Sequence, residues 1–318
     1  MPLYLAIDAG GTKTRCLLAD ETRVLARAST GTVKLMRVAE VDATARLSAM
    51  LDEVAAGAGV TLADVKRTCF GLAGSSSAAV REWARKAIAG AGVGGELSIC
   101  GDEEIALDAA FQGGPGILVI AGTGSNAIGR SRSGGLFGAG GWGPVVGDEG
   151  SGYWIGLEAI RVALHARDQQ SEERSATLLK EIQREWKLGS LGDLVALGNL
   201  RAPSETAPPD FASLAPVVAR CAAFGDVLAQ DILRRAGNEL AELVALVARK
   251  MAETLPFAAD EAIPVVYTGS VLEQIEPVRQ AMIARLAETV RNASVRPESV
   301  DPLDGALWRA RSGPNAGP

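Results

Sequence analysis

Residues 7–14 read Ile-Asp-Ala-Gly-Gly-Thr-Lys-Thr, and residues 121–126 read Ala-Gly-Thr-Gly-Ser-Asn. Each stretch lies between two short apolar runs of strand length, so each predicts a β-hairpin with a turn rich in glycine and threonine. Because the same pattern opens each half of the chain, an internal duplication is the simplest interpretation. Two unrelated glycine-rich hairpins are the alternative.

The rest of the sequence alternates between helix and strand patterns. In the first half we expect strands at 3–7, 15–18, 24–28, 68–72 and 97–100, and helices at 41–56, 78–91 and 103–111. After the break Gly113-Gly114-Pro115-Gly116, we expect strands at 117–120, 127–130 and 264–267, and helices at 153–165, 172–187, 211–222, 225–253 and 271–286. A glycine-rich segment covers 134–152, a loop or edge is expected at 197–209, and disorder from 312 onward. These patterns predict an α/β protein with two domains, residues 1–114 and 115–318.

The composition argues against several kinds of partner. Of the 318 residues, 47% are apolar and 22% are charged, and the net charge is −6. Binding to a nucleic acid or an anionic membrane depends on lysine and arginine, so we expect neither partner. Aromatic residues make up only 4%, too few for a base-stacking platform. The first residues show neither a secretory signal nor a membrane helix, so we expect a cytoplasmic protein.

The scarcity of histidine limits the chemistry that the chain can carry out. His165 is the only histidine, so Ser-His-Asp and Cys-His catalysis are excluded elsewhere in the chain. Cys16, Cys69, Cys100 and Cys221 show no zinc-site or disulfide spacing and are expected to be buried apolar residues. Base catalysis must therefore come from a carboxylate.

Glycine-rich turns suggest three kinds of phosphate site. A P-loop has adjacent glycine and lysine ahead of a helix, but Gly11-Thr12-Lys13 separates the two and a strand follows. A Rossmann fingerprint needs a third glycine and a helix, which Gly122-Thr123-Gly124 lacks. The remaining interpretation is a pair of hairpins whose turns hold a triphosphate between the domains. Glycine suits such turns because it permits a positive φ and has no Cβ to obstruct an anion.

Asp8 precedes the first turn and suits Mg²⁺, which takes few carboxylates together with water and phosphate oxygens. The alternative for both turns is that each simply reverses its hairpin.

Three segments resemble the N-acetylglucosamine kinase family, within the wider BadF/BadG/BcrA/BcrD ATPase group and the sugar kinase/Hsp70/actin superfamily. They are 7–14, 121–126 and 140–151, the last reading Gly-Gly-Trp-Gly-Pro-Val-Val-Gly-Asp-Glu-Gly-Ser. Weaker support comes from 223–226, 267–271 and 302–306. The resemblance implies two actin-like, ribonuclease-H-like domains related by duplication, with the nucleotide in the inter-domain cleft. It also implies a homodimer, ATP and Mg²⁺ as cofactors, and a last helix that packs back on the N-terminal domain.

The resemblance also implies roles for individual residues. The N-terminal domain is the sugar side and carries the first phosphate hairpin, whereas the C-terminal domain carries the second hairpin, the adenosine site and helical insertions. The ATP site would be formed by Asp8, Gly10, Gly11, Thr12, Lys13, Thr123, Gly124, Ala222, Gly269 and Ser270, with Mg²⁺ at Asp8 through water. The sugar site would be formed by Lys34, Asp102, Gly141, Trp142, Gly143 and Asp148. Trp142 and Ala222 as packing residues, and Lys13 as an exposed turn lysine, are the alternatives. Glu149 is expected either to point at Mg²⁺ or to cap the following helix.

Asp102 follows the strand at 97–100 and matches the family's catalytic base. In that role it accepts the proton of the sugar hydroxyl that attacks the phosphate. The alternative is that Asp102 only caps the helix that follows. Glu103, Glu104 and Asp108 are expected to be charges that favour the helix dipole and nothing more.

One position departs from the family pattern. An asparagine of the family holds the sugar in the loop after the third strand, whereas this chain has Lys34 at that register. A lysine there would meet an acidic group, such as the lactyl carboxylate of N-acetylmuramate. A solvated loop lysine is the alternative.

Three functions remain after the sequence analysis. The first is an ATP-dependent kinase acting on an amino sugar, N-acetylglucosamine or glucosamine, at the 6-hydroxyl, with N-acetylmuramate as a further substrate candidate. The second is an activating ATPase that drives a partner enzyme, such as the activators of 2-hydroxyacyl-CoA dehydratase and benzoyl-CoA reductase, whose paired cysteines hold an iron–sulfur cluster. The third is a binding protein that has lost catalysis.

Overall fold

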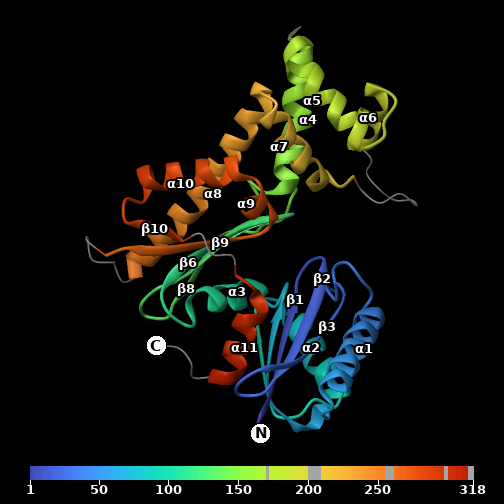
Figure 1. Cartoon of the computed structure of the whole chain (residues 1–318), viewed down its shortest axis with the longest axis vertical. Helices are drawn as coiled ribbons and strands as arrows, with labels where there is room; N and C mark the ends of the chain where they lie inside the picture. Colours follow the sequence, from blue (N-terminus) through green and yellow to red (C-terminus); the bar gives the residue numbers. More distant parts are fainter. Residues whose placement is uncertain (170–171, 200–208, 255–260, 297–299, 314–318) are drawn as a thin grey trace. The chain divides into compact units, whose positions relative to one another are not determined.

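The computed structural model describes residues 1–169, 172–199, 209–254, 261–296 and 300–313 (Figure 1). The chain divides into two compact units. Unit 1 comprises Met1–Gly116, Arg132–Gly135 and the chain from Val300 onward, and unit 2 comprises Ile117–Ser131 and Leu136–Ser299. None of the described helices is both long enough and apolar enough to cross a membrane.

Unit 1 is built on a five-stranded sheet in the order β3-β2-β1-β4-β5. β1 pairs antiparallel with β2 and parallel with β4, which in turn runs parallel to β5. The strands are β1 (Leu3–Ala9), β2 (Lys13–Ala19), β3 (Val24–Gly31), β4 (Val65–Leu72) and β5 (Glu96–Cys100). The helices are α1 (Glu40–Ala58), α2 (Ala78–Gly90), α3 (Asp102–Phe111) and α11 (Pro302–Ser312).

The central strand β1 of this sheet is buried on both faces. Alternate β1 side chains, Leu5 and Ile7, pack into the core that includes α1 and α2. Tyr4 and Ala6 point the other way, into a second core with α3 and α11. A strand that is buried on both faces has apolar residues at successive positions, which explains the apolar run at 3–7.

Unit 2 repeats the same sheet topology in the order β10-β9-β6-β7-β8. Taken in chain order, the strands of both sheets are arranged third, second, first, fourth, fifth, which confirms the predicted duplication and the actin-like ATPase fold. The strands are β6 (Gly116–Ala121), β7 (Ser125–Arg130), β8 (Leu136–Gly140), β9 (Ile263–Thr268) and β10 (Ala293–Arg296). The helices are α4 (Gly152–Asp168), α5 (Glu172–Glu185), α6 (Leu191–Gly198), α7 (Ala215–Ala223), α8 (Val227–Thr254), α9 (Ser270–Gln274) and α10 (Glu276–Thr289).

Several elements differ from the sequence-based expectation. Strand β8 lies inside the segment expected only to be glycine-rich, and β10 and α6 were not expected. The helix expected at 271–286 is two helices, α9 and α10, because the chain leaves helical geometry at Ile275 ahead of Pro277. The helix expected at 211–222 opens with a 3₁₀ turn at Phe211–Leu214. Most of the expected loop at 197–209 and the end of the expected disordered tail lie outside the described residues.

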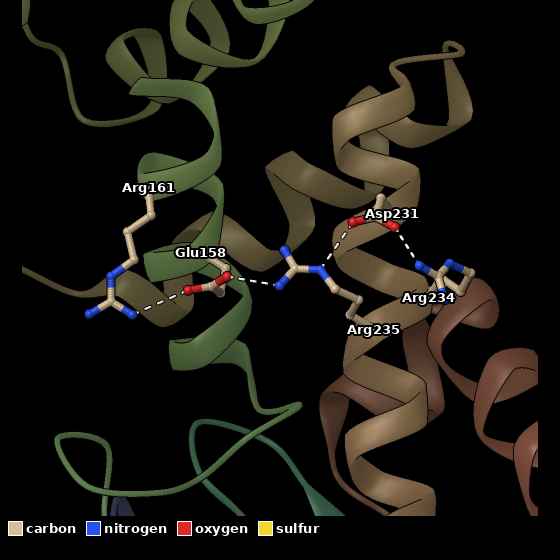
Figure 2. Close-up of polar contacts among 5 residues, drawn as sticks. All are labelled: Glu158, Arg161, Asp231, Arg234 and Arg235. Atoms are coloured by element: carbon tan, nitrogen blue, oxygen red, sulfur yellow. Dashed lines mark hydrogen bonds and ion pairs between the residues drawn. The ribbon is translucent and has the colours of Figure 1, made fainter. Parts of the chain in front are cut away.

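Polar contacts brace helix α4 against α8 in unit 2 (Figure 2). Arg235 of α8 donates to Glu158 Oε2 of α4 at 3.0 Å and to Asp231 Oδ2 of its own helix at 3.0 Å. Its guanidinium also lies 5.4 Å from the ring centroid of Trp154. These contacts hold the helix whose first turn touches the second hairpin.

The last helix belongs to the first unit. Arg309 of α11 donates to the buried carboxylate of Asp108 and, at 3.2 Å, to Glu104 Oε2, both on α3 (Figure 1). The expectation that Glu104 and Asp108 are no more than helix-dipole charges is therefore wrong. A buried carboxylate requires a partner, and the chain supplies it from its C-terminal end.

The contact of α11 with α3 depends on Gly305, since a Cβ there would overlap the Ile105 carbonyl oxygen and the Ala109 nitrogen. We expect Gly305→Ala to force the helices apart and to destabilise the protein by about 2 kcal/mol or more. Thermal unfolding followed by circular dichroism measures this effect. Gly90→Ala is the matched control, because a Cβ at the end of α2 meets open space. Equal melting temperatures for the two variants would contradict the expectation.

Candidate active site

The first hairpin turn joins β1 to β2 and is closed by a hydrogen bond from the Gly10 nitrogen to the Lys13 carbonyl at 3.2 Å. Thr12 and Lys13 are exposed on it. Gly10 and Gly11 do not have the left-handed backbone expected from the sequence, and neither do Gly122 and Gly124 of the second hairpin. The positive-φ argument for these four glycines is therefore wrong. A Cβ on Gly11 would meet no atom within 4 Å, so nothing in the surrounding structure requires glycine there.

A loop after β3 is bound to this turn. Thr32 Oγ1 donates to the Gly10 carbonyl at 3.0 Å, and Arg37 donates to the Gly11 carbonyl at 2.9 Å. The Lys34 backbone nitrogen donates in turn to Thr32 Oγ1 at 3.1 Å. The structure thus attaches the segment carrying Lys34 to the first hairpin. The sequence did not indicate Thr32 and Arg37, because side chains that bind main-chain carbonyls do not require a recognisable sequence motif.

Asp102 is the first residue of α3 and is not its cap. The N-cap position is Gly101, whose nitrogen donates to Glu104 Oε1 at 3.0 Å. The alternative role of Asp102 was to cap this helix. In the structure Glu104 makes the capping hydrogen bond. Because β1, β4 and β5 run parallel, Asp8, the last residue but one of β1, and Asp102, two residues after β5, lie at the same carboxyl edge of the sheet, where sites in α/β folds form.

Burial and neighbouring charge shift the protonation of both carboxylates. Burial raises the pKa of Asp102 to about 8, helped by a hydrogen bond and charge repulsion from Glu103 and by the charge of Asp8. Burial also raises the pKa of Asp8, although Arg15 opposes that shift through a hydrogen bond of 2.7 Å. The two carboxylates therefore lie within electrostatic reach of each other.

The second hairpin, in unit 2, is in contact with the N-terminus of α4. Gly152 donates its nitrogen to the Gly122 carbonyl at 2.8 Å, and Tyr153 donates to the Thr123 carbonyl at 3.3 Å. Thr123 is exposed on this turn. A helix N-terminus carries partial positive charge, so it favours an anion beside the hairpin.

Asp148 is buried against the second hairpin. Its Oδ1 accepts a hydrogen bond from the Gly143 nitrogen at 3.2 Å, and its own backbone has a φ of 60°. A Cβ on Gly124 would lie 2.6 Å from Asp148 Oδ2, so glycine at 124 permits the carboxylate to approach. Asp148 thereby supports the loop at 141–143. Glu149 contributes its carbonyl oxygen, which accepts from Ser125 Oγ at 2.7 Å.

The loop at 141–143 presents an indole to the surface of unit 2. Trp142 is 75% exposed, which excludes the alternative of a buried packing residue. Gly141 and Gly143 on either side have φ values of 73° and 95°, a conformation that favours glycine. Val145 and Val146 extend the exposed apolar segment.

Two neighbouring cavities occupy unit 2. The first, of about 410 Å³, is lined by Gly122, Thr123, Gly152 and Ser270 together with residues of α7. The second, of about 700 Å³, is lined by Ala222 and shares Ala219, Gln274 and Ile275 with the first. Gly269 has a φ of 100°, and a Cβ there would overlap the Ala121 backbone, so only glycine fits beside the first cavity. Ser270 and Thr123 therefore share one cavity, and Ala222 lies in the next.

The site residues expected from the sequence thus fall into two groups. Those of unit 1 are Asp8, Gly10, Gly11, Thr12, Lys13, Lys34 and Asp102, and those of unit 2 are Thr123, Gly124, Gly141, Trp142, Gly143, Asp148, Ala222, Gly269 and Ser270. Among the described residues, no cluster of three or more histidine, cysteine or acidic side chains has the geometry of a metal site.

Comparison with known proteins identifies the family. The profile of the BadF/BadG/BcrA/BcrD ATPase family matches residues 5–308. The chain belongs to this family. It is 30% identical to the N-acetyl-D-glucosamine kinase of Dictyostelium discoideum over 97% of both chains. It is 32% identical to the N-acetylmuramic acid/N-acetylglucosamine kinase of Clostridium acetobutylicum, over 76% of this chain and 77% of that protein.

Among solved structures, a candidate N-acetylglucosamine kinase from Chromobacterium violaceum is similar with a TM-score of 0.73 and 26% identity, covering 96% of this chain and 98% of the other. The family match spans both hairpins and reaches into α11, so both units take part in the similarity.

The raised pKa of Asp102 has a consequence for stability. Between pH 3.8 and about 8 the folded chain keeps a proton on Asp102 that the unfolded chain releases, so folding loses stability as the pH rises through this window. We expect Asp102→Asn to gain free energy of unfolding relative to wild type from pH 4 to pH 8, with no further change above. Urea unfolding at several pH values, without nucleotide or metal, measures the difference. The exposed Asp42→Asn is the control, and a pH-independent difference for Asp102→Asn would contradict the expectation.

Proposed function

We propose that this chain is an ATP-dependent kinase that phosphorylates an amino sugar, N-acetylglucosamine or glucosamine, at its 6-hydroxyl. The observation that carries the proposal is the pair Asp8 and Asp102 at one edge of the unit 1 sheet, beside the hairpin turn of Thr12. Membership of an ATPase family and the two curated kinase relatives support it.

Asp102 is the proposed general base. Phosphoryl transfer needs a group that takes the proton of the attacking hydroxyl, and a base works best when its pKa lies near the working pH. The half-buried position of Asp102, with its pKa raised to about 8, suits this task better than a solvated carboxylate would. The chain's single histidine lies on α4 in unit 2, so a carboxylate is the base that unit 1 offers.

The second hairpin and its cavity are the proposed nucleotide site. Thr123 and Gly124 would hold phosphate oxygens, with the N-terminus of α4 contributing positive charge. The cavity lined by Gly122 and Ser270 has a volume that suits a nucleotide, and the neighbouring cavity at Ala222 extends it. Gly10, Gly11, Thr12 and Lys13 of the first hairpin are the proposed phosphate contacts of unit 1.

The acidic residues of unit 1 fit a magnesium ion. Burial is the main cause of the raised pKa values of Asp8 and Asp102, but repulsion from Asp301 on Asp8, and from Glu103 and Asp8 on Asp102, adds to it, and a bound cation would reduce that repulsion. Magnesium takes few carboxylates and keeps several waters, so Asp8 would hold it through water. When bound, the ion neutralises charge on the phosphates of ATP. Asp8 orients the ion, and Asp102 accepts the proton.

The loop that carries Trp142 is the proposed sugar contact of unit 2. Trp142 offers an apolar face of the kind that packs on a pyranose ring, and Gly141 and Gly143 allow its loop to turn outward. Asp148 keeps this loop in place from within. Lys34 departs from the family asparagine and favours a substrate with a carboxylate, N-acetylmuramate being the candidate.

The activating-ATPase function is not proposed. That class holds an iron–sulfur cluster between subunits through paired cysteines, whereas this chain has no cysteine near its second phosphate turn or in the segment 134–152, and its four cysteines are buried.

A substrate panel tests the kinase directly. ADP release is measured with N-acetylglucosamine, glucosamine, N-acetylmuramate, N-acetylmannosamine, glucose and no sugar. We expect release that depends on an amino sugar and falls about 100-fold or more in Asp102→Asn, because the base is lost. Asp42→Asn is the control and should retain full activity. Hydrolysis that ignores the sugar, or no turnover with any sugar, would refute the kinase.

Lys34 is tested by exchanging it for the family residue. If its ammonium pairs with a lactyl carboxylate, Lys34→Asn should lower kcat/KM for N-acetylmuramate about tenfold relative to N-acetylglucosamine. Lys66→Asn, at an exposed lysine of β4, controls for loss of charge. An unchanged ratio between the two sugars would remove Lys34 from the sugar site.

A further inference from the structure

A single guanidinium in unit 1 is shared by two carboxylates. Arg15 lies on β2 directly opposite Asp8 on β1. Its Nη2 is 2.7 Å from Asp8 Oδ2 and 2.8 Å from Asp301 Oδ1. Asp301 comes from the far end of the chain, as the N-cap residue of α11.

The two carboxylates differ in their other contacts. Asp301 Oδ1 also accepts from the Leu303 nitrogen at 3.1 Å, and its carbonyl accepts from the Asp304 nitrogen at 2.9 Å. These bonds fix Asp301 to the first turn of α11. Asp8 is the more buried of the two, with 14% of its side chain exposed against 36% for Asp301. Asp301 is therefore a stationary acceptor beside a carboxylate that faces the proposed cation.

Arg15 has hydrogen-bonding capacity to spare. Its Nε is buried and has no hydrogen-bond partner within the described part of the chain. A guanidinium can donate two parallel N–H bonds to one carboxylate, a stronger arrangement than the single nitrogen it now shares between two. If Arg15 moved from Asp8 toward Asp301, its Nε could also donate a hydrogen bond.

We propose that Arg15 is a placeholder cation, which neutralises Asp8 when no metal is bound and transfers its hydrogen bonds to Asp301 when a divalent cation binds at Asp8. The inference rests on the proposed function, in which Asp8 holds that cation through water. Two cations close to one carboxylate repel each other, so Arg15 must give way. Asp301 keeps the displaced guanidinium paired, which avoids leaving a partly buried charge without a partner. Arg15 and Asp301 are positioning residues, since they act through Asp8.

The proposal predicts opposite effects for the two partners of Asp8. Without Arg15, no cation competes for Asp8, so a divalent ion should bind more tightly. Without the charge of Asp301, Arg15 has nowhere to move and should stay on Asp8, so the ion should bind more weakly. A pair that only stabilises the fold would weaken binding in both cases.

The experiment measures Mn²⁺ binding in the presence of ADP by electron paramagnetic resonance at pH 8, on the full chain. We expect Arg15→Gln to bind Mn²⁺ about fivefold more tightly and Asp301→Asn about fivefold more weakly than wild type. Asparagine is as good an N-cap as aspartate, so Asp301→Asn removes charge without removing the cap. The double variant should behave like Arg15→Gln. Arg85→Gln, which breaks an exposed ion pair with Glu82 on α2, should change nothing.

Asp8→Asn distinguishes failure of the Arg15 transfer from failure of the proposed cation site at Asp8. If wild type fails to bind Mn²⁺, or if Asp8→Asn binds it as well as wild type does, the cation site at Asp8 is wrong and the transfer falls with it. If Asp8→Asn loses the ion while Arg15→Gln and Asp301→Asn shift binding in the same direction, the cation site stands and the transfer is refuted. The transfer is also refuted if the double variant binds Mn²⁺ as wild type does, because charges that stay in place would simply cancel. Melting curves for each variant identify any that fail to fold. The Asp301→Asn and double variants then show whether Mn²⁺ binding becomes weaker or stronger.

Discussion

Burial of strand β1 on both faces positions the acidic edge of unit 1. Leu5 and Ile7 enter one core while Tyr4 and Ala6 enter the other, so the strand can neither slip by one residue nor rotate without exposing apolar side chains. The strand therefore delivers Asp8 and the first hairpin turn to a defined place at the edge of the sheet. β5, held in register by its parallel pairing with β4, brings Asp102 to that edge.

Gly124 of the second turn acts through its size and not through its backbone conformation. It makes room for Asp148 and has no positive φ. Left-handed backbone occurs instead at Gly141, Gly143 and Gly269, in the loop and at the cavity. Neighbouring glycines thus position the Asp148 carboxylate, the Trp142 indole and the wall of the first cavity.

Much of the fold could be predicted from the sequence because its signals are local. Both hairpins and most helices follow from apolar periodicity and turn residues. Strand β8 could not be predicted in this way, since Gly138 and Gly140 weaken its strand signal and only pairing with β7 holds it extended. In the site, Asp102 and the hairpins are visible as motifs. The contacts of Thr32 and Arg37 with the first turn, and of Arg15 with Asp301, join distant segments, so no local pattern could predict them.

The position of α11 has a consequence for biosynthesis. The first unit is translated first, but its last helix leaves the ribosome only after the whole of unit 2 has been made. At ordinary elongation rates this delay is on the order of ten seconds or more. Until α11 arrives, Asp108 has no Arg309, and the apolar face of the sheet that includes Tyr4 and Ala6 lacks part of its cover. The nascent N-terminal half is therefore an incomplete domain until α11 has been made, and a transcript truncated shortly before residue 300 would yield a protein with both hairpins but without the α11 side of the second core and without Arg309 beside Asp108.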